Sequence, residues 1–221
     1  MKQLVIFDLD GTLLNTIADL GTAVNYALAR NNFPEHPITA YNMMVGNGVR
    51  RLIERAIPSE SRSEEIINRL LTDFRTFYDK HLYDLTTPYP GIALLLSELR
   101  SRDVAVAVAS NKYESAVKRL ISHFFPEIDF SAVCGNIEGY PPKPDPSIVF
   151  RLLSEYPMPK DAILYVGDSS VDIETARRAC VDSVAVTWGF RPLHELVSAN
   201  PSFIINSPAE LLKIISEHTA L

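Results

Sequence analysis

The stretch that decides the fold is VIFDLDGTLLNT, residues 5–16. Its first three residues are apolar and lead into Asp8, one apolar residue separates Asp8 from Asp10, and Gly11 opens a turn. An apolar run without polar alternation indicates a short strand buried on both faces, as in a parallel sheet. Two carboxylates 4 Å apart repel by about 4 kcal/mol at an effective dielectric constant of about 20. A chain that ends a strand on this pair therefore needs a compensating cation nearby.

Apolar runs of the same kind recur along the chain, and segments with helical periodicity lie between them. We expect strands at residues 4–7, 104–109, 131–134, 163–166 and 183–187, and a sixth at 203–205 before a closing helix from about residue 207. Helices are expected at residues 91–102, 113–124 and 171–180. Alternating strands and helices are typical of an α/β fold with a doubly wound, Rossmann-like parallel sheet.

Residues 15–87 interrupt this alternation. Helical patterns cover residues 17–30, 40–44, 49–56 and 63–83, without a convincing strand. In VRRLIERAI the apolar residues share one helical face, and TTPYPG at 86–91 marks the return to the alternating pattern. We therefore expect a core domain of residues 1–14 and 88–221 with an inserted all-helical domain of residues 15–87.

Composition narrows the function classes. The 221 residues are 47% hydrophobic, enough for a sizeable core and a smaller unit. A net charge of −6 argues against a nucleic-acid binder, and no apolar run approaches the roughly 20 residues of a membrane helix. The first residues do not resemble a secretory signal, and Cys134 and Cys180 lie far apart. We expect a cytoplasmic protein without a cysteine- or histidine-based metal site.

Polar residues follow the expected strands where they end. In parallel α/β sheets, ligands bind beyond the carboxyl ends of the strands, so these residues should converge. They are Asp8 and Asp10 after the first strand, Ser110, Asn111 and Lys112 after the second, Asp168 and Asp172 after the fourth, and Lys143 in PPKPDP. Taken singly, each has an ordinary alternative as a turn, a helix N-cap or a surface lysine. Their joint occurrence at strand ends indicates a site.

The acids of this set suit a hard cation. Carboxylate oxygens select an ion such as Mg²⁺. Asp168 and Asp172 stand four residues apart, so on the first turn of a helix they would share one face. One of them can then hold the ion while the other orients or holds a metal-bound water.

The motifs DLDGT, SNK, KPDP and GDSSVD together resemble those of the haloacid dehalogenase-like hydrolases, specifically the phosphatase branch with a helical cap inserted after the first strand. The resemblance covers essentially the whole chain. DLDGTLLNT, VGNG, PYPG, SNK and VGDSSVDI are further similar to the phosphoglycolate phosphatases. Pyrophosphatases and sugar-phosphate enzymes of the superfamily share several of these pieces.

The resemblance implies a role for each motif residue. Asp8 would be the nucleophile that forms an aspartyl-phosphate, and Asp10 would protonate the leaving oxygen and then deprotonate the hydrolytic water. Ser110, Asn111 and Lys143 would bind the phosphoryl group, and Lys143 would also offset the charge of Asp8. Dehalogenases of the superfamily lack an aspartate at the position of Asp10, which favours phosphate esters here.

The resemblance also implies a Mg²⁺ site. Asp8, the backbone carbonyl of Asp10, and Asp168 would hold the ion, with Asp172 in support. This arrangement fits phosphoryl transfer, where positioning and charge stabilisation supply most of the catalysis.

The helical insertion would then act as a lid that excludes water. VGNGVRR would bring Gly46 and Arg50 near the substrate; the alternative is that Gly-Asn-Gly is an ordinary turn and Arg50 faces solvent. TWGFRP after the fifth strand would line the site, or Trp188 would serve packing alone.

Other functions stay open at this point. Within the superfamily, a hexose-phosphate mutase or a pyrophosphatase would use the same core, and a phosphonate hydrolase would need a reactive cap lysine, for which Lys80 is poorly placed. From another class, a signalling receiver uses a similar acidic site. We expect a small phosphate ester as substrate, no nucleic-acid or membrane partner, and a monomer or homodimer.

Overall fold

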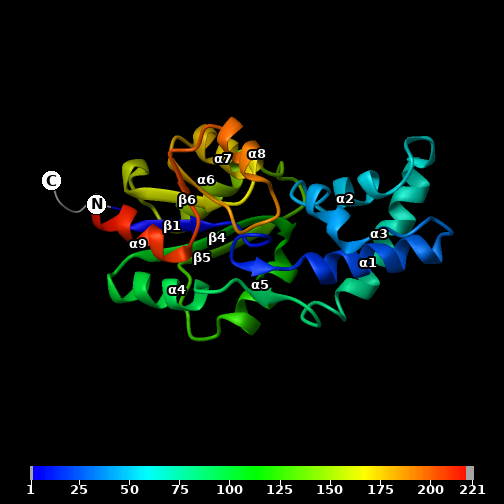
Figure 1. Ribbon diagram of the computed structural model, residues 1–221, viewed down its shortest axis with the longest axis horizontal. Helices are drawn as coiled ribbons and strands as arrows, with labels where there is room; N and C mark the ends of the chain where they lie inside the picture. The colour runs from blue at the N-terminus through cyan, green and yellow to red at the C-terminus, as the bar shows by residue number, and fades with distance from the viewer. Residues whose placement is uncertain (1, 218–221) are drawn as a thin grey trace.

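A parallel sheet forms the centre of the computed structural model, which describes residues 2–217 (Figure 1). Its six strands lie in the order β5-β4-β1-β6-β7-β8, and each pair of neighbours is parallel. They are β1 (Leu4–Phe7), β4 (Ala105–Tyr113), β5 (Ala132–Asn136), β6 (Ile163–Gly167), β7 (Asp182–Val186) and β8 (Phe203–Ile205). The quoted stretch thus supplies a central strand, between β4 and β6.

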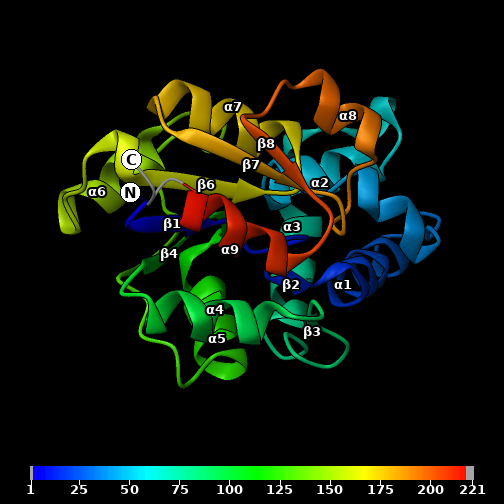
Figure 2. The same cartoon turned by 60° about the vertical axis from the view of Figure 1, so that its left-hand side comes forward.

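Helices cover both faces of the sheet (Figures 1 and 2). One face carries α4 (Ile92–Ser101), α5 (Glu114–Phe124) and α9 (Pro208–Glu217), and the other carries α6 (Ser147–Glu155), α7 (Ser170–Ala179) and α8 (Leu193–Ser198). Alternate residues of β1 face opposite sides. Val5 and Phe7 pack in the cluster that contains α4 and α5, while Leu4 and Ile6 pack with α6 and α7. The predicted doubly wound α/β fold is confirmed.

The inserted segment is built from helices. It contains α1 (Ile17–Arg30), the 3₁₀ turns η1 (Ile38–Met43) and η2 (Ser59–Ser61), α2 (Val49–Ala56) and α3 (Glu64–Tyr78). In Figure 1 these helices lie beyond the carboxyl ends of the strands, so the segment faces the edge where the motif residues gather. The core also contains a third 3₁₀ turn, η3 (Lys160–Ala162).

Several boundaries differ from the expectation. The structure adds α8 and a two-stranded antiparallel ladder of β2 (Leu14–Asn15) and β3 (Thr87–Pro88) at the two ends of the insertion. The helix expected to reach residue 83 ends at Tyr78, where Lys80 and His81 donate their backbone N–H groups to carbonyls three residues back and the α-helical pattern stops. The chain that follows is bonded to Asp19 through the backbone N–H groups of Leu85 and Thr86. A partner this distant in sequence is invisible to helical periodicity.

Within residues 2–217, no helix combines the length and apolarity needed to cross a membrane.

Candidate active site

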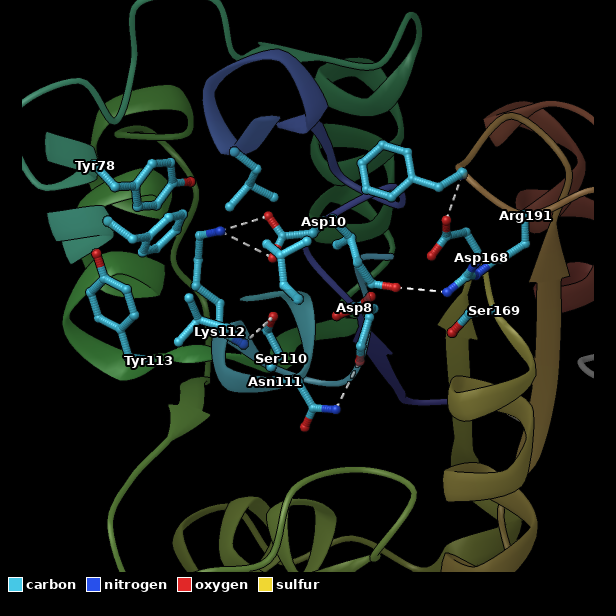
Figure 3. A pocket seen from close by; sticks show the side chains of 18 residues that line it. Asp8, Asp10, Tyr78, Ser110, Asn111, Lys112, Tyr113, Asp168, Ser169 and Arg191 are labelled. Atoms are coloured by element: carbon cyan, nitrogen blue, oxygen red, sulfur yellow. Dashed lines mark hydrogen bonds and ion pairs between the residues drawn. The ribbon is translucent and has the colours of Figure 1, made fainter. Parts of the chain in front are cut away.

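The strand ends bring most of the expected residues to one cavity of about 50 Å³ (Figure 3). Its lining includes Asp8, Asp10, Ser110, Asn111 and Asp168 from the core and Gly46 from the helical segment. Lys143 and Asp172 lie beside this lining, where Lys143 contacts Asp8 and Asp172 contacts Ser169.

The acidic cluster consists of Asp8, Asp168 and Asp172, whose nearest carboxylate oxygens lie within 4.8 Å of one another. All three residues are buried. Burial raises the pKa of Asp8 to about 7, Lys143 lowers it in part, and the charges of Asp172 and Asp10 raise it further. Burial, followed by the charges of Asp172 and Asp8, raises the pKa of Asp168 well above its ordinary value.

Two glycines make room for Asp168. Gly11 has a φ of +89°, a left-handed conformation that favours glycine. A Cβ on Gly11 or on Gly189 would collide with the Asp168 carboxylate. The oxygen Oδ2 of Asp168 also accepts a 2.6 Å hydrogen bond from the Phe190 backbone N–H. The carboxylate is therefore held in place from more than one side.

Lys143 supplies positive charge to the cluster. Its Nζ lies 2.9 Å from Asp8 Oδ1 and 2.7 Å from Asp172 Oδ1, and it donates to the Ala109 carbonyl at 3.0 Å. Burial lowers the pKa of this lysine, but the charges of Asp172 and Asp8 outweigh that effect and raise its pKa well above the ordinary value. Lys143 therefore remains an ammonium ion among the acids.

The expectation that Asp168 and Asp172 share the first turn of a helix is wrong, because α7 begins only at Ser170. Asp172 instead forms a capping box with Ser169. The backbone N–H and the hydroxyl of Ser169 donate to Asp172 Oδ2 at 3.2 and 2.5 Å. With Oδ1 bonded to Lys143, both oxygens of Asp172 have protein partners. This suits a supporting position rather than direct ligation.

The donor set fits a hard divalent cation. Buried carboxylates with raised pKa values mark a place where negative charge lacks compensation, and a cation held by oxygen ligands would supply it. Among these residues, Asp8 and Asp168 offer carboxylates that lie close together.

Asp10 is oriented differently from the cluster. Its Oδ1 accepts from the Thr16 hydroxyl at 2.6 Å and from Lys112 Nζ at 2.9 Å, and Oδ2 lies 3.2 Å from the same Nζ. Sequence reasoning assigned no role to Lys112. Its position two residues after Ser110 on a strand could have indicated it, because alternate strand residues point to the same side.

Asn111 joins three segments. Its amide nitrogen donates to the Gly46 carbonyl at 2.9 Å and to the Lys143 carbonyl at 3.0 Å, and its oxygen accepts from the Lys143 backbone N–H at 2.7 Å. Both N–H donors of the amide are therefore engaged by backbone carbonyls. Asn111 therefore lines the cavity and links Gly46 of the helical segment to the backbone of Lys143 in the core.

The structure places Arg50 outside the cavity. The amphipathic pattern of α2 turns Val49 and Leu52 toward the cavity and leaves Arg50 at the surface. The Arg50 side chain is 43% exposed and pairs with Glu54 and Glu64, so the solvent-facing alternative describes it. Gly46, in contrast, lies in the lining.

TWGFRP contributes Phe190 and Arg191 to the cavity lining, and Arg191 donates to the Val45 carbonyl at 2.7 Å. Trp188 packs against the core and donates to the Thr12 carbonyl at 3.1 Å.

Buried acids and a lysine at the carboxyl edge of a parallel α/β sheet form a site suited to a charged ligand. The family model of the haloacid dehalogenase-like hydrolases matches residues 5–186. The chain belongs to this family, as its motifs predicted.

Several relatives within the family are named phosphoglycolate phosphatases. The phosphoglycolate phosphatase of Mannheimia succiniciproducens is 31% identical over 96% of this chain and 98% of its own length. That of Aquifex aeolicus is 29% identical over 98% of both chains. A solved structure from Lactobacillus delbrueckii subsp. bulgaricus, a predicted phosphoglycolate phosphatase, matches with a TM-score of 0.91 at 33% identity, covering 97% of this chain and 99% of the other. The predicted resemblance to phosphoglycolate phosphatases is confirmed.

Proposed function

We propose that this protein is a Mg²⁺-dependent phosphoric monoester hydrolase that acts on a small phosphorylated metabolite, in the manner of a phosphoglycolate phosphatase, through an aspartyl-phosphate intermediate. The observation that carries the proposal is the 2.9 Å contact between Lys143 and Asp8 inside a buried acidic cluster at the strand ends. The names of its relatives support the choice of phosphate ester.

Asp8 acts as the nucleophile. A carboxylate oxygen of Asp8 forms a bond to phosphorus while the bond from phosphorus to the ester oxygen breaks. Asp10 gives its proton to the departing oxygen. In the second half, Asp10 takes a proton from water, the resulting hydroxide attacks phosphorus, and Asp8 leaves with its original charge.

Positive charge and hydrogen bonds stabilise both steps. Lys143 offsets the negative charge that builds up on the phosphoryl oxygens, and Ser110 donates its hydroxyl to one of them. Asp8, the Asp10 backbone carbonyl and Asp168 hold Mg²⁺, and Asp172 orients Lys143. When bound, the ion supplies further charge stabilisation to the phosphoryl oxygens.

The helical segment acts as a cap on a separate core domain. Residues 15–87 form the cap, and residues 2–14 and 88–217 of the described chain belong to the core. Apolar side chains of the cap complete the cavity wall, namely Leu20, Val45, Val49, Leu52 and Phe74. Such a wall excludes water from the reaction.

This lining disfavours a hexose-phosphate mutase, because a sugar needs several polar partners and the cap side of the cavity is mainly apolar. A signalling receiver is disfavoured by Asp10, which promotes hydrolysis of the phosphoryl group that a switch must keep.

A panel of phosphomonoesters tests the proposal, with phosphate release followed in the presence of Mg²⁺ and in EDTA. We expect repeated turnover of small esters, 2-phosphoglycolate among them, and loss of turnover in EDTA. Accumulation of one phosphoryl group per protein from acetyl phosphate, without turnover, would contradict it.

A further inference from the structure

Lys112 and Tyr78 form a feature that the proposed reaction does not use. Lys112 lies at the end of β4 in the core, and Tyr78 is the last residue of α3 in the helical segment. The Lys112 Nζ lies 4.9 Å from the centroid of the Tyr78 ring, and both residues line the cavity. In Figure 3 the two side chains lie on the same side of it, next to Asp10.

The Tyr78 hydroxyl is buried without a partner. The residue is 0% exposed, and its oxygen makes no hydrogen bond to any of the described residues. Figure 3 shows this hydroxyl directed toward Lys112 and Asp10. Buried polar groups are normally hydrogen-bonded, so an unsatisfied one that lines a cavity indicates a ligand group.

A neighbouring tyrosine shows the contrast. Tyr113 lines the same wall, but its hydroxyl donates to Asp79 Oδ1 at 2.6 Å. The lack of a partner is therefore specific to Tyr78 and is not a property of every tyrosine on this wall.

Lys112 is a buried cation with donors to spare. The residue is 8% exposed, and the hydrogen bonds that its ammonium makes within residues 2–217 all go to the carboxylate of Asp10. An ammonium group has three N–H donors. It can keep part of this contact, or release it, and still bind a second anionic group.

The position of Lys112 next to Asp10 indicates which part of the substrate Lys112 faces. In the proposed reaction, Asp10 faces the ester oxygen that leaves with the product. A group in contact with Asp10 but remote from the Asp8 and Asp168 cluster therefore faces the leaving group and not the phosphoryl group.

We propose that Lys112 and the Tyr78 hydroxyl bind a carboxylate on the leaving group of the substrate, so that this pair selects a phosphorylated small carboxylic acid. The inference rests on the proposed phosphatase function and deepens it. One ammonium and one hydroxyl match a single carboxylate. A second phosphate would bring more charge next to Asp10 with the same two donor groups, which disfavours a bisphosphate or pyrophosphate substrate.

Arg191 is the other cation of the cavity lining. It lies on the opposite side from Lys112 in Figure 3. Its guanidinium donates to the Val45 carbonyl at 2.7 Å and to Met43 Sδ at 3.4 Å, so it holds the loop of the helical segment. We therefore assign Arg191 the role of holding that loop. The experiment below distinguishes Arg191 from Lys112 as the group that binds the carboxylate.

The test compares two esters that differ only in the group at issue. In 2-phosphoglycolate a carboxylate follows the ester CH₂, and in 2-hydroxyethyl phosphate a CH₂OH group replaces it. The ratio of their kcat/KM values, measured with Mg²⁺ present, reports the contribution of the carboxylate. We expect the wild-type protein to favour 2-phosphoglycolate by about 10- to 100-fold, as for hydrogen bonds to a charged group.

Single substitutions then show which side chains produce the preference for 2-phosphoglycolate. Lys112→Met should remove most of it, and Lys112→Arg should retain part. Tyr78→Phe, which removes only the hydroxyl, should lower the ratio by about 3- to 10-fold. The matched variants Tyr113→Phe and Arg191→Met should keep the wild-type ratio, even where Arg191→Met slows both substrates. A thermal melt of each variant checks folding, and Tyr78→Phe carries the test should Lys112→Met fail to fold.

Results that contradict the inference can be told apart from results that contradict the proposed function. A ratio unchanged in both Lys112→Met and Tyr78→Phe overturns the inference, as does a ratio that collapses in Arg191→Met instead. A wild-type protein that hydrolyses both esters equally well also overturns it, while leaving the phosphatase function intact. No phosphate release from any monoester refutes the proposed function itself.

Discussion

At the residue scale, the two aspartates of the DLD motif have different surroundings despite lying two positions apart. Asp8 belongs to the buried cluster with Asp168 and Lys143. Asp10 points to Thr16 and Lys112 and stays outside that cluster. The separation fits the two roles proposed for these residues, because a nucleophile must face phosphorus while an acid must face the leaving oxygen.

Asp10→Asn is therefore expected to lower kcat by about 10²- to 10⁴-fold, the usual contribution of a general acid and base. The asparagine retains the backbone carbonyl proposed as a Mg²⁺ ligand. Isothermal calorimetry should accordingly show Mg²⁺ affinity close to that of the wild type. Unchanged turnover would remove Asp10 from the mechanism.

The raised pKa of Asp8 predicts a pH-dependent stability. Because its folded-state pKa of about 7 lies above its ordinary value of 3.8, the folded protein binds more protons than the unfolded chain between these values. Stability of the metal-free protein should thus fall as pH rises through that window. Mg²⁺ compensates the deprotonated acids, so it should raise Tm more at about pH 7.5 than at about pH 5.

Asp168→Asn serves as the control for this measurement, because it removes one carboxylate of the cluster. Its Tm should respond weakly to Mg²⁺ at either pH. A wild-type Tm that Mg²⁺ raises equally at both values would contradict the linkage.

At the element scale, Asp19 connects the two ends of the helical segment. It lies in the first turn of α1 and is 3% exposed. Its carboxylate accepts hydrogen bonds from the Leu85 N–H at 3.0 Å, the Thr86 N–H at 2.8 Å and the Thr86 hydroxyl at 2.7 Å. The start of α1 is thereby tied to the chain that returns to the sheet through β3. A carboxylate near a helix N-terminus also interacts favourably with the helix dipole.

Asp19→Ala is expected to lower the free energy of unfolding by about 2–4 kcal/mol, since it leaves several donors unsatisfied in a buried place. Urea denaturation measures the change. Asp84→Ala is the matched control, because the Asp84 side chain is 56% exposed and pairs only with His81 among the described residues. Its effect should stay within about 0.5 kcal/mol.

At the scale of the whole molecule, two side chains of the core hold one loop of the helical segment. Asn111 donates to the Gly46 carbonyl and Arg191 to the Val45 carbonyl. This loop lines the cavity, so the hydrogen bonds from Asn111 and Arg191 hold the helical segment over the site. They are few, and neither is an ion pair, which suits a contact that opens for substrate entry.

Replacing both residues, Asn111→Ala with Arg191→Ala, should speed hydrogen exchange of the amides at 45–49 by about 5- to 30-fold, the effect of one to two kcal/mol. KM for a phosphomonoester should rise as well, because a loosened loop contributes less to binding. Arg51→Ala is the control, since it removes an exposed ion pair with Glu54 on the same segment. Equal exchange in all three proteins would show that the loop is held by other contacts.

The cytoplasmic location stays a prediction from composition, and monomer or homodimer stays an open alternative. Size-exclusion chromatography with light scattering would decide the second.

Local pattern alone determined the sheet, most helix positions and the identity of the core motif residues. Apolar periodicity is a local property, and parallel strands bring their carboxyl ends to one edge wherever the chain wanders between them. Asp8, Ser110 and Asp168 could be grouped on that ground, and the KPDP motif added Lys143. The interpretation of Asp168 and Asp172 as helix neighbours failed because a helix start depends on its cap.

Tertiary structure alone decided what the side chains of the cavity contact. Lys112 lies 102 residues from the Asp10 that it pairs with, and Asn111 lies 65 residues from Gly46. It also left Arg50 at the surface and the Tyr78 hydroxyl without a partner among residues 2–217. Hydrogen bonds and ion pairs require atoms within about 3–4 Å, and the packing of distant segments, which no local pattern contains, sets those distances.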